Sequence, residues 1–153
     1  MKRVKIGDIV EVQTAKGLTY AQYTHKDKVY GALIRVFDET YGERPRSFEH
    51  VVAGKVRFSV FFPLGPAVSR GIFEVVGNEP LRPDLQEFPL FRAGNRGLPG
   101  TQVAVWWLYD GEKEWKIGEL SEEQRKLPIL GICNDTFLIS RIESGWTPET
   151  DPF

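Results

Sequence analysis

The chain has 153 residues, which is the length of a single domain and enough to bury a sizeable core. Its 41% apolar and 27% charged residues are ordinary proportions for a soluble globular protein. A net charge of −1 excludes a general electrostatic attraction to DNA or to anionic lipid.

Three strands joined by short turns are predicted near the N-terminus. Asp8–Gln13 alternates apolar and polar groups, as a half-buried strand does, and Leu18–His25 is rich in Tyr and Thr. Val29–Phe37 is the third strand, and Gly31 inside it indicates a bulge or a close backbone approach. Consecutive strands on short turns predict an antiparallel meander.

The middle of the chain is predicted to hold shorter elements separated by glycines and prolines. Residues 38–47 form a polar loop with a basic tip, and Lys55–Phe62 form a strand that ends at Pro63. Ala67–Arg70 is compatible with one helical turn, and Ile72–Val76 is the next strand.

A long irregular segment and a hairpin follow. Glu79–Gly100 contains three prolines and several apolar side chains, so we expect it to pack on the body, except for an exposed and mobile stretch at Arg92–Gly97. Val103–Tyr109 is the most hydrophobic strand. The turn signal Asp110–Gly111 then predicts a hairpin with Glu114–Gly118.

Two helices are predicted near the C-terminus. Ser121–Gln124 is a capping box that opens a short helix. A final helix is predicted from near Asn134–Asp135 to Ser144, with Asp135 as its cap and Gly145 as its stop. Leu138 and Ile142 lie four residues apart on one face of this helix, and we expect that face to dock on the sheet.

These elements predict an α+β fold that is mainly β. It is a curled antiparallel sheet, or an SH3-like partly open barrel, with the C-terminal helix packed on it. Residues 1–153 form a single domain with a core from about residue 4 to residue 146, and the tail after Pro148 is expected to fray.

The chain offers little catalytic or metal-binding chemistry. Cys133 is the only cysteine, so no intrachain disulfide can form, and a reducing compartment is favoured. No Cys/His metal spacing or phosphate-binding glycine loop occurs, and we expect no metal and no cofactor. Cys133 paired with His25 or His50 is a formal nucleophile, but its apolar neighbours favour a buried, inert thiol. Without an apolar run behind the basic N-terminus, no signal peptide is expected, and we predict a cytoplasmic protein.

Charge is divided unevenly along the chain. Residues 71–153 hold 8 Lys/Arg and 14 Asp/Glu, against 12 and 7 in residues 1–70. Such an asymmetry orients a partner through long-range fields, but solvated faces also differ by chance, and both readings stay open.

The predicted hairpin combines aromatic rings with acidic groups. Trp106 and Trp107 are adjacent, so one faces inward and the other outward on a flat strand. Trp115 lies across the hairpin and, with Tyr109, forms a predicted aromatic patch. Three acidic residues rim this patch: Asp110, Glu112 and Glu114. Aromatic anchors with a charged rim are typical of protein-binding hot spots, whereas core packing is the alternative for any single ring.

The alternative function is a nucleic-acid-binding module that uses the basic N-terminal meander. Lysines and arginines lie near Tyr20, Tyr23 and Tyr30, and small barrels use such rings as stacking platforms. Tyr20 and Tyr23 are three residues apart, however, so they point to opposite faces of a strand unless a bulge intervenes. Such a module would bind single strands with an affinity that falls steeply with salt.

Several segments together resemble the immunity protein 26 family of bacterial polymorphic-toxin systems. They are an opening Lys-x-Gly-Asp strand at Lys5–Val12, the segments Gly31–Val36, Phe61–Leu64, Gly71–Gly77 and Phe88–Arg92, and then a Trp-rich strand and a capped helix. These motifs are structural, and none is a catalytic signature. The resemblance implies a cytoplasmic protein that binds a cognate toxin domain and neutralises it.

The leading hypothesis is therefore a non-enzymatic immunity protein whose partner is a cognate toxin domain, such as a nuclease. No binding to a membrane is expected. A nuclease would present a basic substrate groove to the acidic hairpin and helix start. The predicted partner-binding residues are Trp107, Tyr109, Asp110, Glu112, Glu114 and Trp115.

Overall fold

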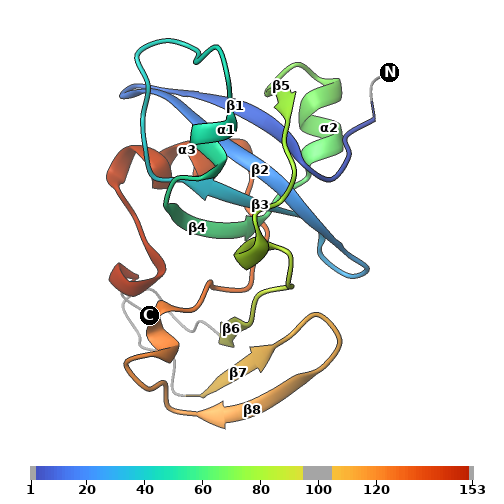
Figure 1. Ribbon diagram of the computed structural model, residues 1–153. Coiled ribbons are helices and arrows are strands. Elements are labelled where there is room, and N and C mark those ends of the chain that lie inside the picture. The colour runs from blue at the N-terminus through green and yellow to red at the C-terminus, as the bar shows by residue number, and fades with distance from the viewer. Residues whose placement is uncertain (1–2, 95–104, 152–153) are drawn as a thin grey trace.

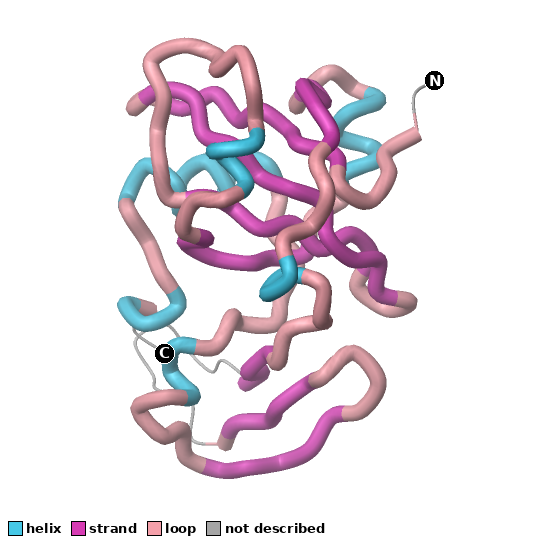
Figure 2. The backbone as a smooth tube through the Cα atoms, viewed as in Figure 1, coloured by secondary structure: helices cyan, strands magenta, loops and turns pink. Residues whose placement is uncertain are grey.

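The computed structural model describes residues 3–94 and 105–151, and these form two antiparallel sheets with short helices around them (Figures 1 and 2). The strands are β1 (Asp8–Thr14), β2 (Gly17–Asp27), β3 (Gly31–Phe37), β4 (Val56–Phe61), β5 (Glu74–Asn78), β6 (Phe91–Gly94), β7 (Trp106–Tyr109) and β8 (Glu114–Gly118). The α-helices are α1 (Glu49–Val52), α2 (Leu64–Ser69) and α3 (Asp135–Ser144), and the one-turn 3-10 helices are η1 (Pro83–Leu85), η2 (Gln124–Lys126) and η3 (Pro148–Thr150).

The first sheet has five strands in the order β4-β3-β2-β1-β5. Its centre is the predicted meander of β1, β2 and β3, which is confirmed. The register of β2 with β3 shifts between Tyr23 and His25, so the irregularity lies in β2, opposite the strand for which Gly31 predicted it. The α+β, mainly β prediction is confirmed, and the two sheets do not close into a barrel.

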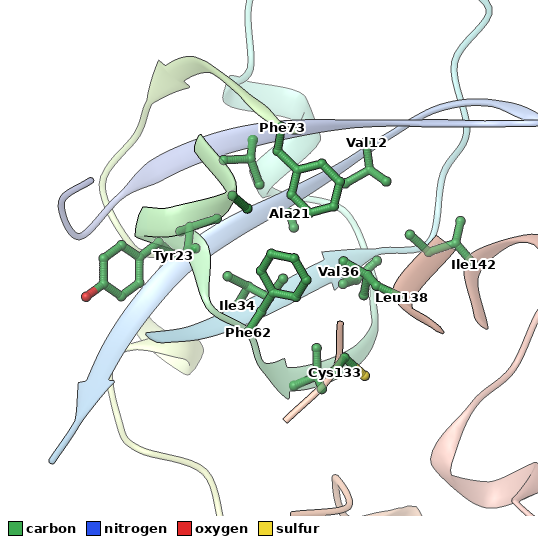
Figure 3. Packing of buried hydrophobic residues seen from close by; sticks show 14 of the residues in the cluster. Val12, Ala21, Tyr23, Ile34, Val36, Phe62, Phe73, Cys133, Leu138 and Ile142 are labelled. Atoms are coloured by element: carbon green, nitrogen blue, oxygen red, sulfur yellow. The ribbon is translucent and has the colours of Figure 1, made fainter. Parts of the chain in front are cut away.

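One face of the five-stranded sheet holds the largest apolar cluster (Figure 3). Side chains from the central strands, including Val12, Ile34 and Val36, pack against α2 and α3. Leu138 and Ile142 of α3 are buried there, as the helical periodicity predicted. Burial of these side chains removes apolar surface from water, which is the main driving force for folding.

The opposite face of this sheet is apolar at one end and polar in the middle. Tyr20 and Phe37 pack against Phe48 and α1 at the apolar end. Beside them Arg35 is buried and donates hydrogen bonds to the hydroxyls of Thr24 at 3.1 Å and Ser59 at 3.4 Å. Because burial disfavours a charge, the pKa of Arg35 falls to about 10.

The second sheet has three strands in the order β6-β7-β8 and docks on the first through aromatic rings. Phe61 of β4 stacks on Phe91 of β6 with 5.1 Å between ring centroids. Leu33 and Tyr109 complete this junction cluster, in which all four side chains are buried. The hairpin therefore depends on the larger sheet for its core.

Residues 128–133, here called the strap, connect the two sheets a second time. The strap makes two parallel bridges, one with β6 and one with β4. Its main-chain hydrogen bonds join Arg92 to Pro128 and Leu130 at 2.9 and 2.8 Å, and Phe61 to Gly131 and Cys133 at 3.3 and 3.0 Å. The strap thus occupies the outer edge of β4 at Phe61 and that of β6 at Arg92, where these strands would otherwise be open to pairing with other chains.

The expectation of an exposed Arg92 and of a frayed tail is wrong for Arg92 and for residues 149–151, while residues 152 and 153 lie outside the described residues. Arg92 is fully buried, donates a hydrogen bond to the Pro148 carbonyl oxygen at 2.7 Å and lies over the Trp106 ring. Asp151 is buried as well and accepts a hydrogen bond from Trp146 Nε1 at 3.2 Å. Arg92 and the tail cover each other. This one long-range contact explains why the predictions for Arg92 and for the tail were both wrong. The rest of the predicted exposed stretch, residues 95–97, lies outside the described residues.

The C-terminal helix follows the predicted bounds, but its cap is one residue earlier. The Asn134 side chain, not that of Asp135, accepts the hydrogen bond from the Phe137 N–H, and Gly145 ends the helix. The two reciprocal hydrogen bonds of the capping box at Ser121 and Gln124 are present, but the box lies in the turn before η2, whose own N-cap residue is Glu123. Within the described ranges, no helix has the length and apolar character needed to cross a membrane.

Candidate functional site

The hairpin of β7 and β8 is shaped by its turn. The Asp110 carboxylate accepts hydrogen bonds from the N–H groups of Glu112 and Lys113 at 3.0 and 2.9 Å. These bonds lower the pKa of Asp110, because they stabilise its charged form. Gly111 has φ of +99°, and a Cβ atom there would lie 2.9 Å from the Phe88 ring. The Asp-Gly sequence therefore suits this turn, because the Asp110 side chain bonds the turn's N–H groups and the positive φ at position 111 favours glycine.

Strand register divides the predicted aromatic patch between two faces. Trp115 is paired with Leu108, and Glu114 is paired with Tyr109. Paired residues share a face and neighbours along a strand alternate, so Trp115 and Tyr109 lie on opposite faces. The prediction that they form one patch is wrong.

Tyr109 is a core residue and does not offer its ring to a partner. Its side chain is 6% exposed, its hydroxyl donates to Asp27 Oδ1 at 2.8 Å, and its ring meets the rings of Tyr30 and Phe88 edge-on. Burial raises the pKa of the phenol, and the Asp27 carboxylate raises it further. The predicted binding role of Tyr109 is therefore corrected to a structural one.

The remaining predicted residues stay accessible. Glu112 and Glu114 are exposed, Trp115 is 37% exposed, and Trp107 and Asp110 are half-buried. Trp106 is the inward-facing member of its pair and Trp107 the less buried one, as predicted. We use "hairpin surface" for five residues: Trp107, Asp110, Glu112, Glu114 and Trp115.

A shallow depression lies beside the hairpin tip. Its volume is about 390 Å³, and its walls come from the β2–β3 turn and from the hairpin turn. Lys26 and Lys28 stand on one side, with Asp110 and Glu112 on the other. Because its two sides carry opposite charges, the depression is better suited to contact the polar surface of another protein than to bind a single small anion or cation.

The candidate nucleophile pair is not assembled. Cys133 is buried, and its Sγ lies 3.4 Å from Arg141 Nη1. Burial raises the pKa of the thiol, which disfavours the reactive thiolate. His25 Nε2 is 2.8 Å from the Gln86 carbonyl oxygen, and neither histidine lines the 190 Å³ depression that Cys133 borders. Across residues 3–94 and 105–151, no cluster of His, Cys, Asp and Glu could hold a metal ion.

Sequence reasoning missed a second, more apolar groove of about 520 Å³. Val29 and Ile132 line it and are 67% and 60% exposed, with Arg3 and Lys26 nearby. Val29 begins the predicted third strand, and Ile132 adjoins a buried thiol, so both resembled core positions. No local pattern could have identified the groove, because the strap brings Ile132 there from the far end of the chain.

No family model, no curated protein and no solved structure matches the chain. The resemblance to the immunity protein 26 family therefore stays a prediction.

Proposed function

We propose that this chain is a non-enzymatic binding protein that neutralises a bacterial toxin domain in the cytoplasm, using its hairpin surface. The observation that supports the proposal is an exposed, acidic hairpin whose Trp115 ring is available to a partner. Exposed aromatic residues beside charged groups are the usual composition of interface hot spots.

The acidic groups of the hairpin differ from those of the larger sheet in how they are paired. Glu11 and Glu74 both contact Arg44, at 2.8 and 3.0 Å. Among the described residues, neither Glu112 nor Glu114 takes part in an ion pair. A basic partner can therefore contact these two carboxylates without first displacing an internal cation.

A nuclease toxin is the partner class that fits this surface best. Its substrate groove must be basic in order to bind phosphates, and acidic side chains placed there compete directly with nucleic acid. The acidic balance of residues 71–153 adds a long-range attraction that speeds encounter.

The alternative nucleic-acid-binding reading has no stacking platform in Tyr20 and Tyr23. As the alternation predicted, these side chains belong to different faces, and each is buried in its own cluster. No other observation favours this alternative.

The proposal is tested with the purified C-terminal domain of the toxin encoded beside this gene. Binding of the wild-type chain is measured by calorimetry at several salt concentrations. Because two charges facing a basic groove would be reversed, Glu112→Lys with Glu114→Lys should lower the affinity by about 10- to 100-fold and flatten the salt dependence.

A matched control reverses two exposed acids in α1 and the loop before it, Glu43→Lys with Glu49→Lys. The helix α1 lies at the top of Figure 1, whereas β7 and β8 lie at the bottom. This variant has the same net charge as the hairpin variant and should keep nearly full affinity. Equal affinity and equal salt dependence for the hairpin variant and the wild type would sink the proposal. A single-stranded oligonucleotide in a parallel titration tests the alternative function.

A further inference from the structure

β8 is the outermost strand of the smaller sheet, at the bottom of Figure 1. Among the described residues, no strand pairs with its outer edge. The side chains of Glu114, Trp115 and Lys116 are all exposed, so nothing covers this part of the edge. β5 is also an edge strand, but its three central residues are half-buried, whereas three consecutive residues of β8 are exposed.

The main-chain groups of β8 that point outward can be assigned from the hairpin. The Asp110 N–H donates to the Lys113 carbonyl oxygen at 3.2 Å, so the adjacent pair of Tyr109 and Glu114 is a non-hydrogen-bonded pair. Hydrogen-bonded and non-hydrogen-bonded pairs alternate along antiparallel strands. The N–H and C=O groups of Glu114 and Lys116 therefore point away from β7, and those of Trp115 point toward it.

We infer that this edge pairs with β8 of a second copy of the chain, antiparallel, about a two-fold axis at Trp115. In this register Glu114 lies opposite Lys116 of the second copy, and Lys116 lies opposite Glu114 of the second copy. The outward-pointing main-chain groups are those of the two charged residues, so each facing pair exchanges two hydrogen bonds. The two copies of Trp115 form the central non-hydrogen-bonded pair, where side chains approach most closely.

The sequence of the edge selects a second copy as the occupant. Glu-Trp-Lys is self-complementary when it is read in the opposite direction, which a two-fold interface requires. Centring the axis on Glu114 or on Lys116 would place two like charges directly opposite each other, which is destabilising. Of the three registers centred within Glu114–Lys116, the one centred on Trp115 satisfies both the charges and the outward main-chain groups.

The resulting assembly is a continuous six-stranded antiparallel sheet made from the three-stranded sheets of the two copies. Its contact is one short strand from each copy, smaller than a standard stable interface, so a weak dimer is expected with a dissociation constant on the order of 10–100 μM. Glu114 and Trp115 also belong to the hairpin surface, so a second copy and the proposed toxin would exclude each other at these residues.

Single and paired charge variants test the register. Sedimentation equilibrium between about 10 μM and 1 mM should show reversible dimerisation of the wild-type chain. Glu114→Lys alone and Lys116→Glu alone each place like charges opposite each other twice, and each should weaken dimerisation by at least about tenfold. An equimolar mixture of the two variants should form heterodimers, because every Lys then faces a Glu.

The double variant, Glu114→Lys with Lys116→Glu, keeps the net charge and should dimerise like the wild type. A wild-type chain that stays monomeric up to 1 mM, or a mixture that gains nothing over the separate variants, overturns the inference. A monomer whose β8 amides become protected from hydrogen exchange only with the toxin domain would assign the edge to the toxin instead. Because self-association is measured without any toxin, its failure leaves the proposed function untouched, and the reverse also holds.

Discussion

The two sheets differ in how completely the rest of the chain covers them. The five-stranded sheet has apolar or polar clusters on both faces, covered by α1, α2, α3 and the segment around Leu85. The three-stranded sheet buries the rings of Phe91 and Tyr109 where it meets the larger sheet and the ring of Trp106 beside Arg92, while three residues of β8 stay exposed. The larger sheet therefore holds most of the buried core, and the smaller sheet is the part on which the proposed recognition surface lies.

The smaller sheet cannot provide its own stability. A short three-stranded unit needs an apolar face packed on something else. Here that support comes from the junction cluster around Phe61 and from the strap, which hydrogen-bonds to both sheets. A partner that binds the hairpin therefore contacts an element held in place by the larger sheet, which lowers the entropic cost of binding.

High pH is expected to have the largest effect, because it acts on both sheets and on their junction at once. Burial raises the pKa of every tyrosine in the chain, and that of Tyr41 rises to about 12. The folded state thus holds protons that the unfolded state releases above pH 10. The stability linked to these tyrosines is complete below pH 10 and is lost as the pH rises above it, by about 1.4 kcal/mol per pH unit for each tyrosine that stays neutral in the fold.

Phenolate absorbance at 295 nm, followed together with circular dichroism, measures this effect. The absorbance should rise only as the fold is lost, whereas the chain in denaturant should titrate near pH 10. Arg35 acts in the opposite direction, because its buried charge is penalised less above its pKa of about 10, but it is one group against five. A folded protein whose tyrosines titrate near pH 10 would contradict the burial described here.

Phe61→Ala should cause the largest loss of stability among single substitutions at the junction. The ring is fully buried and packs on the rings of Tyr30 and Phe91. Its removal should lower the free energy of unfolding by about 3–5 kcal/mol, from lost burial and the cavity that remains. Urea denaturation measures the change, and Phe137→Ala, at a ring that is 47% exposed, is the control with an expected change within about 0.5 kcal/mol.

Gly111→Ala tests whether the hairpin turn is held by its contact with the larger body. Alanine at positive φ costs about 1–2 kcal/mol, and its Cβ atom would also collide with the Phe88 ring at 2.9 Å. Gly71→Ala is the matched control, since Gly71 has φ of +73° and no atom within 4 Å of the added Cβ. The Gly111 variant should be the less stable of the two by about 1 kcal/mol in urea denaturation. Equal losses of stability in the two variants would mean that the Phe88 ring moves aside without a measurable energetic cost.

Local patterns predicted much of the fold. The strand at β1, the helical spacing of Leu138 and Ile142 and the capping box at Ser121 depend on neighbours within a few residues, and the structure confirms them. The alternation predicted a half-buried strand, however, whereas β1 is buried on both faces, with Ile9 in one cluster and Val10 in the other. The same reasoning predicted the hairpin and the division of Trp106 and Trp107 into one inward and one outward side chain, without saying which is which.

The candidate site was only partly predictable, because its errors come from long-range contacts. Buried Tyr109 donates a hydrogen bond to Asp27, which is 82 residues earlier in the chain. Buried Arg92 donates one to the carbonyl oxygen of Pro148, which is 56 residues later. Rules based on the spacing of residues along the sequence cannot predict contacts between residues so far apart in the chain. The division of Tyr109 and Trp115 between two faces follows from strand register, which is set by the turn and does not follow from the order of residue types.

Tyr109→Phe should have the smallest effect on stability and the most local one. It removes the hydroxyl that joins the hairpin to Asp27, while that carboxylate keeps the N–H groups of Val29 and Tyr30. A loss of about 1–2 kcal/mol is expected, as for a hydrogen bond to a buried charged group. Amide hydrogen exchange should accelerate more in β7 and β8 than in β1 to β3, because the substitution loosens only the junction. A double-mutant cycle with Asp27→Asn isolates the pair, and full additivity together with uniform exchange would show that this bond does not hold the hairpin to the larger sheet.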